Sequence, residues 1–404
     1  MDATSDADKT NRDAHMNGGM RAMLTFEEPS LAKLRGRESA KWTTYPPDVL
    51  PAWVAEMDFP LAEPIRQRLH RAIDANDCGY AHPTAIPEAF AGFAKSRFGW
   101  TVDPARVRTA PEVMVAVAEV LRVVTKSGDG VVINPPVYPP FAMTINEVGR
   151  KVVDAPLAHV PGGGWDLDLD ALESSFKAGA RAYLLCNPHN PTGRVLSADQ
   201  VKRIAELAKR HSVTVISDEI HAPLTLAGAL HVPFVSVSEA IGTNAVTLTS
   251  ASKAWNIAGL KCAVIVAGSS HMQSTLKALP VELTERTGHL GVMANVAAFR
   301  DGAPYLDDLV RHLDRNRALM AELLGVYLPA VRYIPPQAGY LAWLDCSALG
   351  LGDDPAKVFL KKGKVALMRG LDFGRQGACF CRVNMGTSGA ILSEIVGRMG
   401  KALA

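Results

Sequence analysis

The chain has 404 residues, of which 48% are hydrophobic, and its 43 Lys and Arg residues against 41 Asp and Glu residues leave a formal net charge of +2. A chain of this length can bury one large core and a second, smaller one. The mixed and nearly balanced charge argues against a nucleic-acid or membrane surface, and no stretch reaches the roughly 20 apolar residues that a transmembrane helix needs.

The N-terminal residues 1–25 are mostly polar, and we expect them to form a mobile tail. Within this tail, Met1–Asn17 is polar and lacks the apolar stretch of a signal peptide, so the default location of the protein is cytoplasmic. Three further methionines, Met16, Met20 and Met23, leave the true start codon open.

Four short apolar runs in the middle of the chain predict β-strands, and each ends in a polar cluster. Val131–Ile133 leads to Tyr138, Ala182–Cys186 to Asn187–Gly193, Val213–Ser217 to Asp218–His221, and Ala245–Leu248 to Thr249–Lys253. Helix-length amphipathic segments such as Ala198–Arg210 lie between these runs. Continuous apolar strands that alternate with helices indicate an α/β fold with a mostly parallel sheet covered on both faces.

In such sheets, ligands bind beyond the carboxyl ends of the strands, so we expect one site that collects Tyr138, Asn190, Asp218 and Lys253. A lysine in a hydroxyl-rich turn suits a Schiff base to an aldehyde cofactor, because burial and nearby positive charge lower its pKa and free a neutral amine. The hydroxyls and Lys261 suit a phosphate on that cofactor. Asp218 would keep a pyridine nitrogen protonated, as pyridoxal 5′-phosphate (PLP) requires.

Each of these residues also has an ordinary interpretation. The lysine turn could be an exposed surface turn, since short motifs produce false positives. Asp218 could cap a helix, Asn190 could belong to a turn before Pro191, and Tyr138 could pack between prolines. Their joint occurrence after four strands favours the cofactor site.

At this point the chain resembles a known family. Asn187–Gly193, Asp218–His221 and Ser250–Lys261 are similar to signature segments of fold-type I, class I/II aminotransferase-like PLP enzymes. Leu50–Phe59, with its Trp-Val-Ala-x-Met-Asp-Phe pattern, resembles more narrowly the MalY/PatB group of cystathionine β-lyases, which are C–S lyases. The similarity runs from roughly Ser39 to the C-terminus. It implies a large, mostly parallel seven-stranded sheet domain plus a smaller α+β domain.

The resemblance also implies roles around the cofactor ring. Lys253 matches the catalytic lysine that holds the cofactor, and Asp218 matches the partner of the pyridine nitrogen. Asn190 matches the donor to the 3′-oxygen, and His221 stands where many relatives have Tyr. Tyr138 matches the aromatic residue stacked on the ring, and both Tyr138 and Asn190 are expected to contact substrate.

Other matched residues concern the phosphate and the substrate carboxylate. Ser250 and the backbone of Val113 and Met114, which open a helix, match phosphate donors, since helix N-termini bind anions. Lys261 would make the phosphate site more positive than usual. Arg382 matches the arginine that binds the substrate α-carboxylate in a bidentate way. Tyr80 matches a tyrosine that reaches the phosphate of the neighbouring subunit in a homodimer.

The implied reaction is α,β-elimination of cystathionine or a related S-substituted L-cysteine to a thiol, pyruvate and ammonia. The alternatives are an aminotransferase and, second, a regulatory binding protein of the same fold; we expect no DNA-binding module, because too few residues precede Lys41. Glu56, where the family usually has Asp, and Arg369 leave the substrate choice open. We expect an amino-acid substrate and neither a nucleic-acid nor a membrane partner.

We expect residues 26–60 to join the small domain, residues 61–293 to form the large PLP-binding domain, and residues 294–404 to form the small C-terminal domain. Lys41–Phe59 should form one wall of the active-site mouth. A helical stripe of leucines and a methionine predicts core packing without a functional role: Leu306, Leu309, Leu313, Met320 and Leu324.

The six cysteines lack paired metal-binding spacing, so no metal site is expected. Cys379 and Cys381 stand two residues apart, which on a strand places both on one face. We interpret them as small buried hydrophobic residues.

Overall fold

The computed structural model describes residues 28–160, 162 and 164–403. The predicted tail at residues 1–25, together with the candidate start sites Met16, Met20 and Met23, lies outside the described residues. Among the described residues, no helix is both long enough and apolar enough to cross a lipid bilayer.

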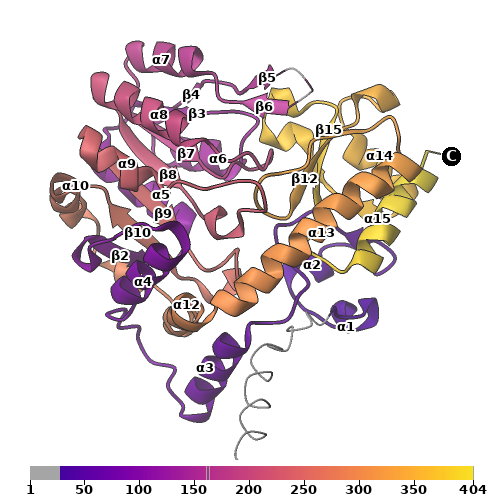
Figure 1. Ribbon diagram of the computed structural model, residues 1–404, viewed down its shortest axis with the longest axis horizontal. Coiled ribbons are helices and arrows are strands. Elements are labelled where there is room, and N and C mark those ends of the chain that lie inside the picture. The colour runs from indigo at the N-terminus through magenta and orange to yellow at the C-terminus, as the bar shows by residue number, and fades with distance from the viewer. Residues whose placement is uncertain (1–27, 161, 163, 404) are drawn as a thin grey trace, which may run out of the picture.

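A seven-stranded sheet forms the centre of the larger part of the molecule (Figure 1). Five of its strands, β9, β8, β7, β3 and β4, lie side by side in this order, and each runs parallel to the next. Strand β10 runs antiparallel to both of its neighbours, β9 and β2. The predicted mostly parallel α/β sheet is therefore confirmed. Its order is β2 (Val107–Ala110), β10 (Ala263–Ala267), β9 (Ala245–Thr249), β8 (Thr214–Asp218), β7 (Ala182–Cys186), β3 (Gly130–Ile133) and β4 (Lys151–Asp154).

Both faces of this sheet are covered, because successive side chains of each strand enter different hydrophobic clusters. On β7, Leu184 packs in one cluster, whereas Tyr183 and Leu185 pack in the other. The Leu184 side is covered mainly by α5 (Val113–Val124), α6 (Pro140–Glu147), α10 (Ser270–Thr275) and α11 (Glu282–Glu285). The opposite side is covered by α3 (Glu63–Asp74), α4 (Ile86–Phe98), α7 (Leu169–Lys177), α8 (Ala198–Arg210), α9 (Phe234–Ile241) and α12 (His289–Asp301).

A second, antiparallel sheet lies beside the first and has its own hydrophobic cluster. Its order is β11 (Arg332–Tyr333), β12 (Leu341–Asp345), β15 (Phe380–Asn384) and β14 (Met368–Arg369). Two helices, α14 (Pro355–Gly363) and α15 (Gly389–Lys401), contribute to this cluster. A separate hairpin is formed by β5 (Ala158–Val160) and β6 (Gly164–Asp166).

The N-terminal segment joins this second part of the molecule. After α1 (Leu31–Arg35) and α2 (Ala40–Thr43), the short strand β1 (Leu50–Pro51) pairs in parallel with β13 (Val365–Ala366). This pairing brings the next residues, Ala52–Phe59, between the two sheets. Three of them, Trp53, Val54 and Ala55, line a cavity.

The long helix α13 (Ala303–Tyr327) connects the two hydrophobic clusters (Figure 1). Leu306, Leu309 and Leu313 pack with the large sheet, whereas Met320 and Leu324 pack with the small one. The stripe is thus core, as predicted. The division of the chain into domains at residue 293 stays a prediction.

Our interpretation of Cys379 is wrong. Strand β15 begins one residue later, at Phe380, and Cys379 has a φ of 67°, in the left-handed region. Its side chain is therefore partly exposed and lies with Sγ 3.9 Å from Asp353 Oδ1. Cys381, in the strand, is buried against Cys346 with the two sulfurs 3.7 Å apart.

Candidate active site

A cavity of about 400 Å³ lies at the carboxyl ends of the central strands and is lined by ten of the eleven predicted site residues. These are Val113, Met114, Tyr138, Asn190, Asp218, His221, Ser250, Lys253, Lys261 and Arg382. Tyr80 does not line it; it sits between α3 and α4 with 97% of its surface exposed. A larger cavity of about 1040 Å³ beside α3 and α12 shares no lining residue with this one and has no lysine in its lining.

The fold explains why these residues converge. Asp218 is the last residue of β8, and Lys253 follows the end of β9 by four positions. Asn190 follows the end of β7 by four positions. Because β7, β8 and β9 are parallel neighbours, their carboxyl ends deliver all three side chains to the same edge of the sheet.

The amine of Lys253 is prepared for nucleophilic attack. Its Nζ donates a hydrogen bond of 3.0 Å to the carbonyl oxygen of Ala55. Burial lowers the pKa of Lys253 to about 8, and the nearby Arg382 cation adds to this effect, while Asp218 opposes it. A neutral amine is therefore accessible near physiological pH.

Asp218 and His221 both line the cavity, and burial shifts the pKa of each side chain towards its uncharged form. Burial raises the pKa of Asp218 to about 7, although its Oδ1 accepts a 3.1 Å hydrogen bond from the backbone N–H of Ile220. Burial lowers the pKa of His221 to about 3, so its imidazole is neutral, and its buried Nδ1 has no hydrogen-bond partner in the described part of the chain. A cation beside Asp218 would restore its charged form.

Arg382 lies on β15 and reaches the cavity from the small sheet. Its Nη1 donates to Asn190 Oδ1 at 2.9 Å, and its Nη2 donates to the carbonyl oxygen of Trp53 at 3.0 Å. Its guanidinium lies 5.1 Å from the centre of the Phe373 ring. Burial lowers the pKa of Arg382 to about 10, yet the group stays cationic at neutral pH, and its buried Nε has no hydrogen-bond partner among residues 28–160, 162 and 164–403. An anionic ligand would complete this environment.

The other end of the cavity suits a phosphate. Helix α5 begins at Val113, so the backbone N–H groups of Val113 and Met114 are at a helix N-terminus. Ser250 Oγ accepts from Ser252 N at 3.0 Å and donates to Cys262 O at 2.6 Å, so its hydroxyl must turn to donate to an anion.

Lys261 is a half-exposed cation at this end of the cavity. It has a φ of 58°, and its Nζ is paired with Glu112 Oε2 at 3.0 Å. The helix N-terminus and this cation are both suited to a phosphate group.

Some lining residues had no signal in the sequence beyond their segment. The expected wall from Lys41–Phe59 is present as Trp53, Val54 and Ala55, but the use of the Ala55 carbonyl oxygen was not anticipated. Met143 and Met368 also line the cavity, and nothing in their local pattern indicates it. A backbone carbonyl or a single apolar side chain leaves no recognisable pattern in the sequence, so its place in a cavity cannot be predicted from the sequence.

The two residues that leave the substrate choice open, Glu56 and Arg369, lie outside this lining. Glu56 Oε1 accepts a 2.6 Å hydrogen bond from Ser39 Oγ. Arg369 is paired with Asp354 at 2.9 Å. Neither side chain lines the cavity, so their influence on substrate choice stays a hypothesis.

Comparison with known proteins identifies the family. The family model for aminotransferase class I and II matches residues 67–399. The chain belongs to the aminotransferase class I and II family. A Mycobacterium leprae protein that carries the provisional name cystathionine beta-lyase is 45% identical over 400 residues, covering 94% of this chain and 98% of the relative. Cystathionine beta-lyase PatB of Bacillus subtilis is 36% identical, covering 91% and 97% of the two chains.

Solved structures of this family agree in fold. The PLP-bound C–S lyase from Staphylococcus hominis has a TM-score of 0.87 at 25% identity, covering 94% of this chain and 99% of that chain. A PLP-bound protein from Clostridium difficile, provisionally described as an aminotransferase, has a TM-score of 0.89 at 29% identity, with the same coverage. Proteins described as lyases and as aminotransferases thus share this architecture, and the fold alone does not decide between the two reactions.

The residues present fit PLP. Lys253 offers an amine for the aldehyde, and the buried Asp218 carboxylate needs a cation such as a protonated pyridine nitrogen. His221 Nδ1 is a buried atom without a hydrogen-bond partner among the described residues, and the helix N-terminus at Val113 lines the same cavity. A ring with a phosphate at one end matches this distribution.

Proposed function

We propose that this protein is a PLP-dependent carbon–sulfur lyase that cleaves cystathionine or a related S-substituted L-cysteine by α,β-elimination. The observation that carries the proposal is the enclosure of the Lys253 amine, the Asp218 carboxylate and the Arg382 guanidinium in one cavity. The relatives named cystathionine beta-lyase, at 36–45% identity over most of the chain, support the elimination reaction over other PLP chemistry.

In this proposal, each residue has one task. Arg382 binds the α-carboxylate of the substrate, for which its planar fork is suited. Asp218 holds a proton on the ring nitrogen of the cofactor, and Tyr138 lies against the ring face. Asn190 and His221 face the 3′-oxygen, while Ser250, Lys261 and the N–H groups of Val113 and Met114 hold the phosphate.

PLP, when bound, supplies the electrophilic carbon that takes the substrate amine and the conjugated ring that accepts the electron pair from Cα. Lys253, released from the cofactor, takes the Cα proton on Nζ. The Cβ–S bond then breaks and the sulfur leaves as a thiolate, which takes up a proton. Addition of one water to the remaining three-carbon unit accounts for pyruvate and ammonia.

A transaminase is the second candidate, because the family model and the Clostridium difficile structure carry that description. The two reactions differ in the number of organic substrates that they require. Elimination consumes only the amino acid and water, whereas transamination needs a keto acid as second substrate.

The test is a pyruvate assay with L-cystathionine and with S-substituted L-cysteines, without added keto acid. We expect sustained pyruvate and thiol formation in equal amounts. Turnover that stops after one equivalent and resumes only on addition of a keto acid would identify a transaminase instead.

A homodimer and a cytoplasmic location are part of the same proposal. The exposure of Tyr80 supports the dimer, since a tyrosine with 97% of its surface in solvent is available to a neighbouring subunit. None of the six cysteines forms a disulfide, as is typical of a reducing compartment.

A further inference from the structure

Six consecutive backbone carbonyls, those of residues 53–58, each accept a hydrogen bond from a side chain. We call this stretch the carbonyl segment. It is neither helix nor strand, so these carbonyls take no part in a helix or a sheet, and only Val54 O also accepts a bond from the backbone of the described residues, from Glu56 N at 2.9 Å. The donors are Arg382 to Trp53 O, Asn384 to Val54 O, Lys253 and Tyr340 to Ala55 O, Lys41 and Asn384 to Glu56 O, Asn256 to Met57 O, and Arg37 to Asp58 O.

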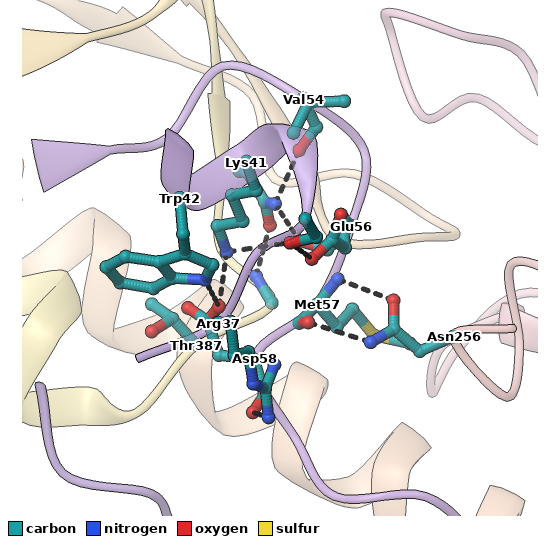
Figure 2. Close-up of polar contacts among 12 residues, drawn as sticks. Arg37, Lys41, Trp42, Val54, Glu56, Met57, Asp58, Asn256 and Thr387 are labelled. Atoms are coloured by element: carbon teal, nitrogen blue, oxygen red, sulfur yellow. Dashed lines mark hydrogen bonds and ion pairs between the residues drawn. The ribbon is translucent and has the colours of Figure 1, made fainter. Parts of the chain in front are cut away.

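An ion pair away from the cavity holds the C-terminal end of this segment (Figure 2). Lys41 Nζ lies 2.8 Å from Asp58 Oδ1, and both side chains are almost fully buried. Trp42 Nε1 donates to the same Asp58 oxygen at 3.1 Å, and Lys41 Nζ also donates to Glu56 O at 3.1 Å. Lys41 thus contacts a side chain and a backbone oxygen of the carbonyl segment at once.

A buried ion pair of this kind contributes little net stability to the folded state. Removing two charges from water costs free energy, and well-packed apolar residues often replace a buried pair without loss of stability. Burial lowers the pKa of Lys41, although the adjacent Asp58 carboxylate opposes this effect. Because Lys41 contacts both Glu56 O and Asp58 Oδ1, we infer that the pair fixes the backbone conformation between these two residues.

The peptide next to Glu56 carries the carbonyl that contacts the lysine. Ala55 O accepts from Lys253 Nζ at 3.0 Å and from Tyr340 OH at 2.9 Å. In the proposed reaction Lys253 leaves the cofactor and afterwards carries the proton from Cα. A released lysine side chain regains several rotatable bonds, so a fixed acceptor keeps its amine near the reacting carbon.

We propose that the Ala55 carbonyl oxygen holds the amine of Lys253 whenever this lysine is not linked to the cofactor, and that Lys41 and Asp58 are positioning residues that fix this carbonyl. The inference rests on the proposed function, because it assigns a state of Lys253 within that reaction. Arg382 is less dependent on the segment, since it keeps its bond to Asn190. A substitution of Lys41 should therefore affect proton transfer by Lys253, and with it kcat, more than carboxylate binding by Arg382, and with it KM.

Three variants of the cofactor-loaded full chain test the proposal. Lys41→Met removes one of the two donors to Glu56 O, the other being Asn384, and leaves Asp58 as a buried charge without its ion-pair partner. The double variant Lys41→Met/Asp58→Asn removes both charges and keeps an oxygen for Trp42 Nε1. Thr243→Val is the matched control, because it removes one buried hydrogen bond, of 2.7 Å to Ala205 O, away from the cavity.

We expect the single variant to lose both thermal stability and kcat, with kcat falling by about 10- to 100-fold and KM changing by less than about threefold. The double variant should regain most of the stability but not kcat. In protein saturated with an amino acid that displaces Lys253 from the cofactor, the visible circular dichroism of the bound cofactor should weaken in both Lys41 variants and stay unchanged in Thr243→Val.

Either of two results would overturn the inference. One is a double variant whose kcat and cofactor circular dichroism both return to the parent values, which would make the pair a stability element only. The other is a Lys41→Met variant that is less stable but has the parent kcat. Absence of pyruvate formation by the parent protein would instead refute the proposed lyase function, and the circular dichroism comparison would still test the role of Lys41.

Discussion

Asn190 Oδ1 accepts a 2.9 Å hydrogen bond from Arg382 Nη1, although the two residues are 192 positions apart in the chain. The contact joins the loop after β7 to the middle of β15, and so links the large sheet to the small sheet at the cavity. Because the amide oxygen is engaged, the amide nitrogen of Asn190 is left as a donor for an oxygen of the cofactor ring. One asparagine can thus orient both the arginine and the cofactor.

The first prediction concerns Arg382. Arg382→Lys keeps a positive charge but removes the planar fork, so we expect kcat/KM for the amino-acid substrate to fall by about 100-fold, mostly through a higher KM. Steady-state kinetics measures it. Arg210→Lys, on the exposed surface of α8, is the control and should have the parent kinetics. A normal KM in a folded, cofactor-loaded Arg382→Lys protein would contradict carboxylate binding by Arg382.

The second prediction concerns Lys253. Purified protein should be yellow, and Lys253→Ala should lose the visible absorbance band of the lysine-linked cofactor, because Lys261 is the only other lysine among the described residues that line the cavity. Lys261 is half exposed and paired with Glu112, so Lys261→Ala should keep the band and bind the cofactor somewhat more weakly. The absorption spectra of the two variants decide the matter. An unchanged band in Lys253→Ala would rule out this lysine as the attachment point.

The third prediction is a pH dependence of stability caused by Asp218. Its pKa rises from 3.8 to about 7 on folding, so the folded state favours the protonated form and stability falls as the carboxyl ionises between about pH 4 and pH 7. Asparagine does not ionise, so Asp218→Asn removes the loss of stability that ionisation causes. The cofactor-free variant should therefore be more stable than the cofactor-free parent at about pH 8 but not at about pH 4.

Thermal unfolding of both cofactor-free proteins at the two pH values measures this difference. Loading the parent with cofactor should reduce the pH dependence, since a cationic ring nitrogen favours the charged carboxylate. In turnover, Asp218→Ala should lose roughly 100-fold or more, which is the scale of losing a main electrostatic element of a site. A stability difference that is equal at both pH values would show that Asp218 does not titrate as described.

The fourth prediction concerns Tyr80 and subunit assembly. If Tyr80 completes the site of a neighbouring subunit, mixing Tyr80→Phe with Lys253→Ala subunits gives hybrid dimers with one site that carries both defects and one that carries neither. We expect activity to be recovered in the mixture. Lack of recovery despite demonstrated subunit exchange, and despite a real loss in the Tyr80→Phe parent, would place Tyr80 in its own subunit or outside the site.

The sequence by itself determined the large sheet and the segments that form the cavity. Strand β7 spans the residues expected for it, β8 and β9 are shifted or extended by a single residue, and helix α8 has the predicted bounds. These features depend on local periodicity and on the residue types directly after each strand, and both can be read within a short stretch of chain. For the same reason, the motifs at Lys253, Asp218 and Asn190 were sufficient to predict a shared site.

Only the tertiary structure decided how these segments are held against one another. The contact of Ala55 O with Lys253, the pairing of Lys41 with Asp58 inside the protein, and the bond between Asn190 and Arg382 join positions that are 17 to 198 residues apart. The left-handed turn at Cys379, which our strand pattern missed, is likewise set by the surrounding chain. Such contacts depend on how the two sheets pack and on which backbone groups packing leaves unpaired, and no local pattern of residue types encodes either.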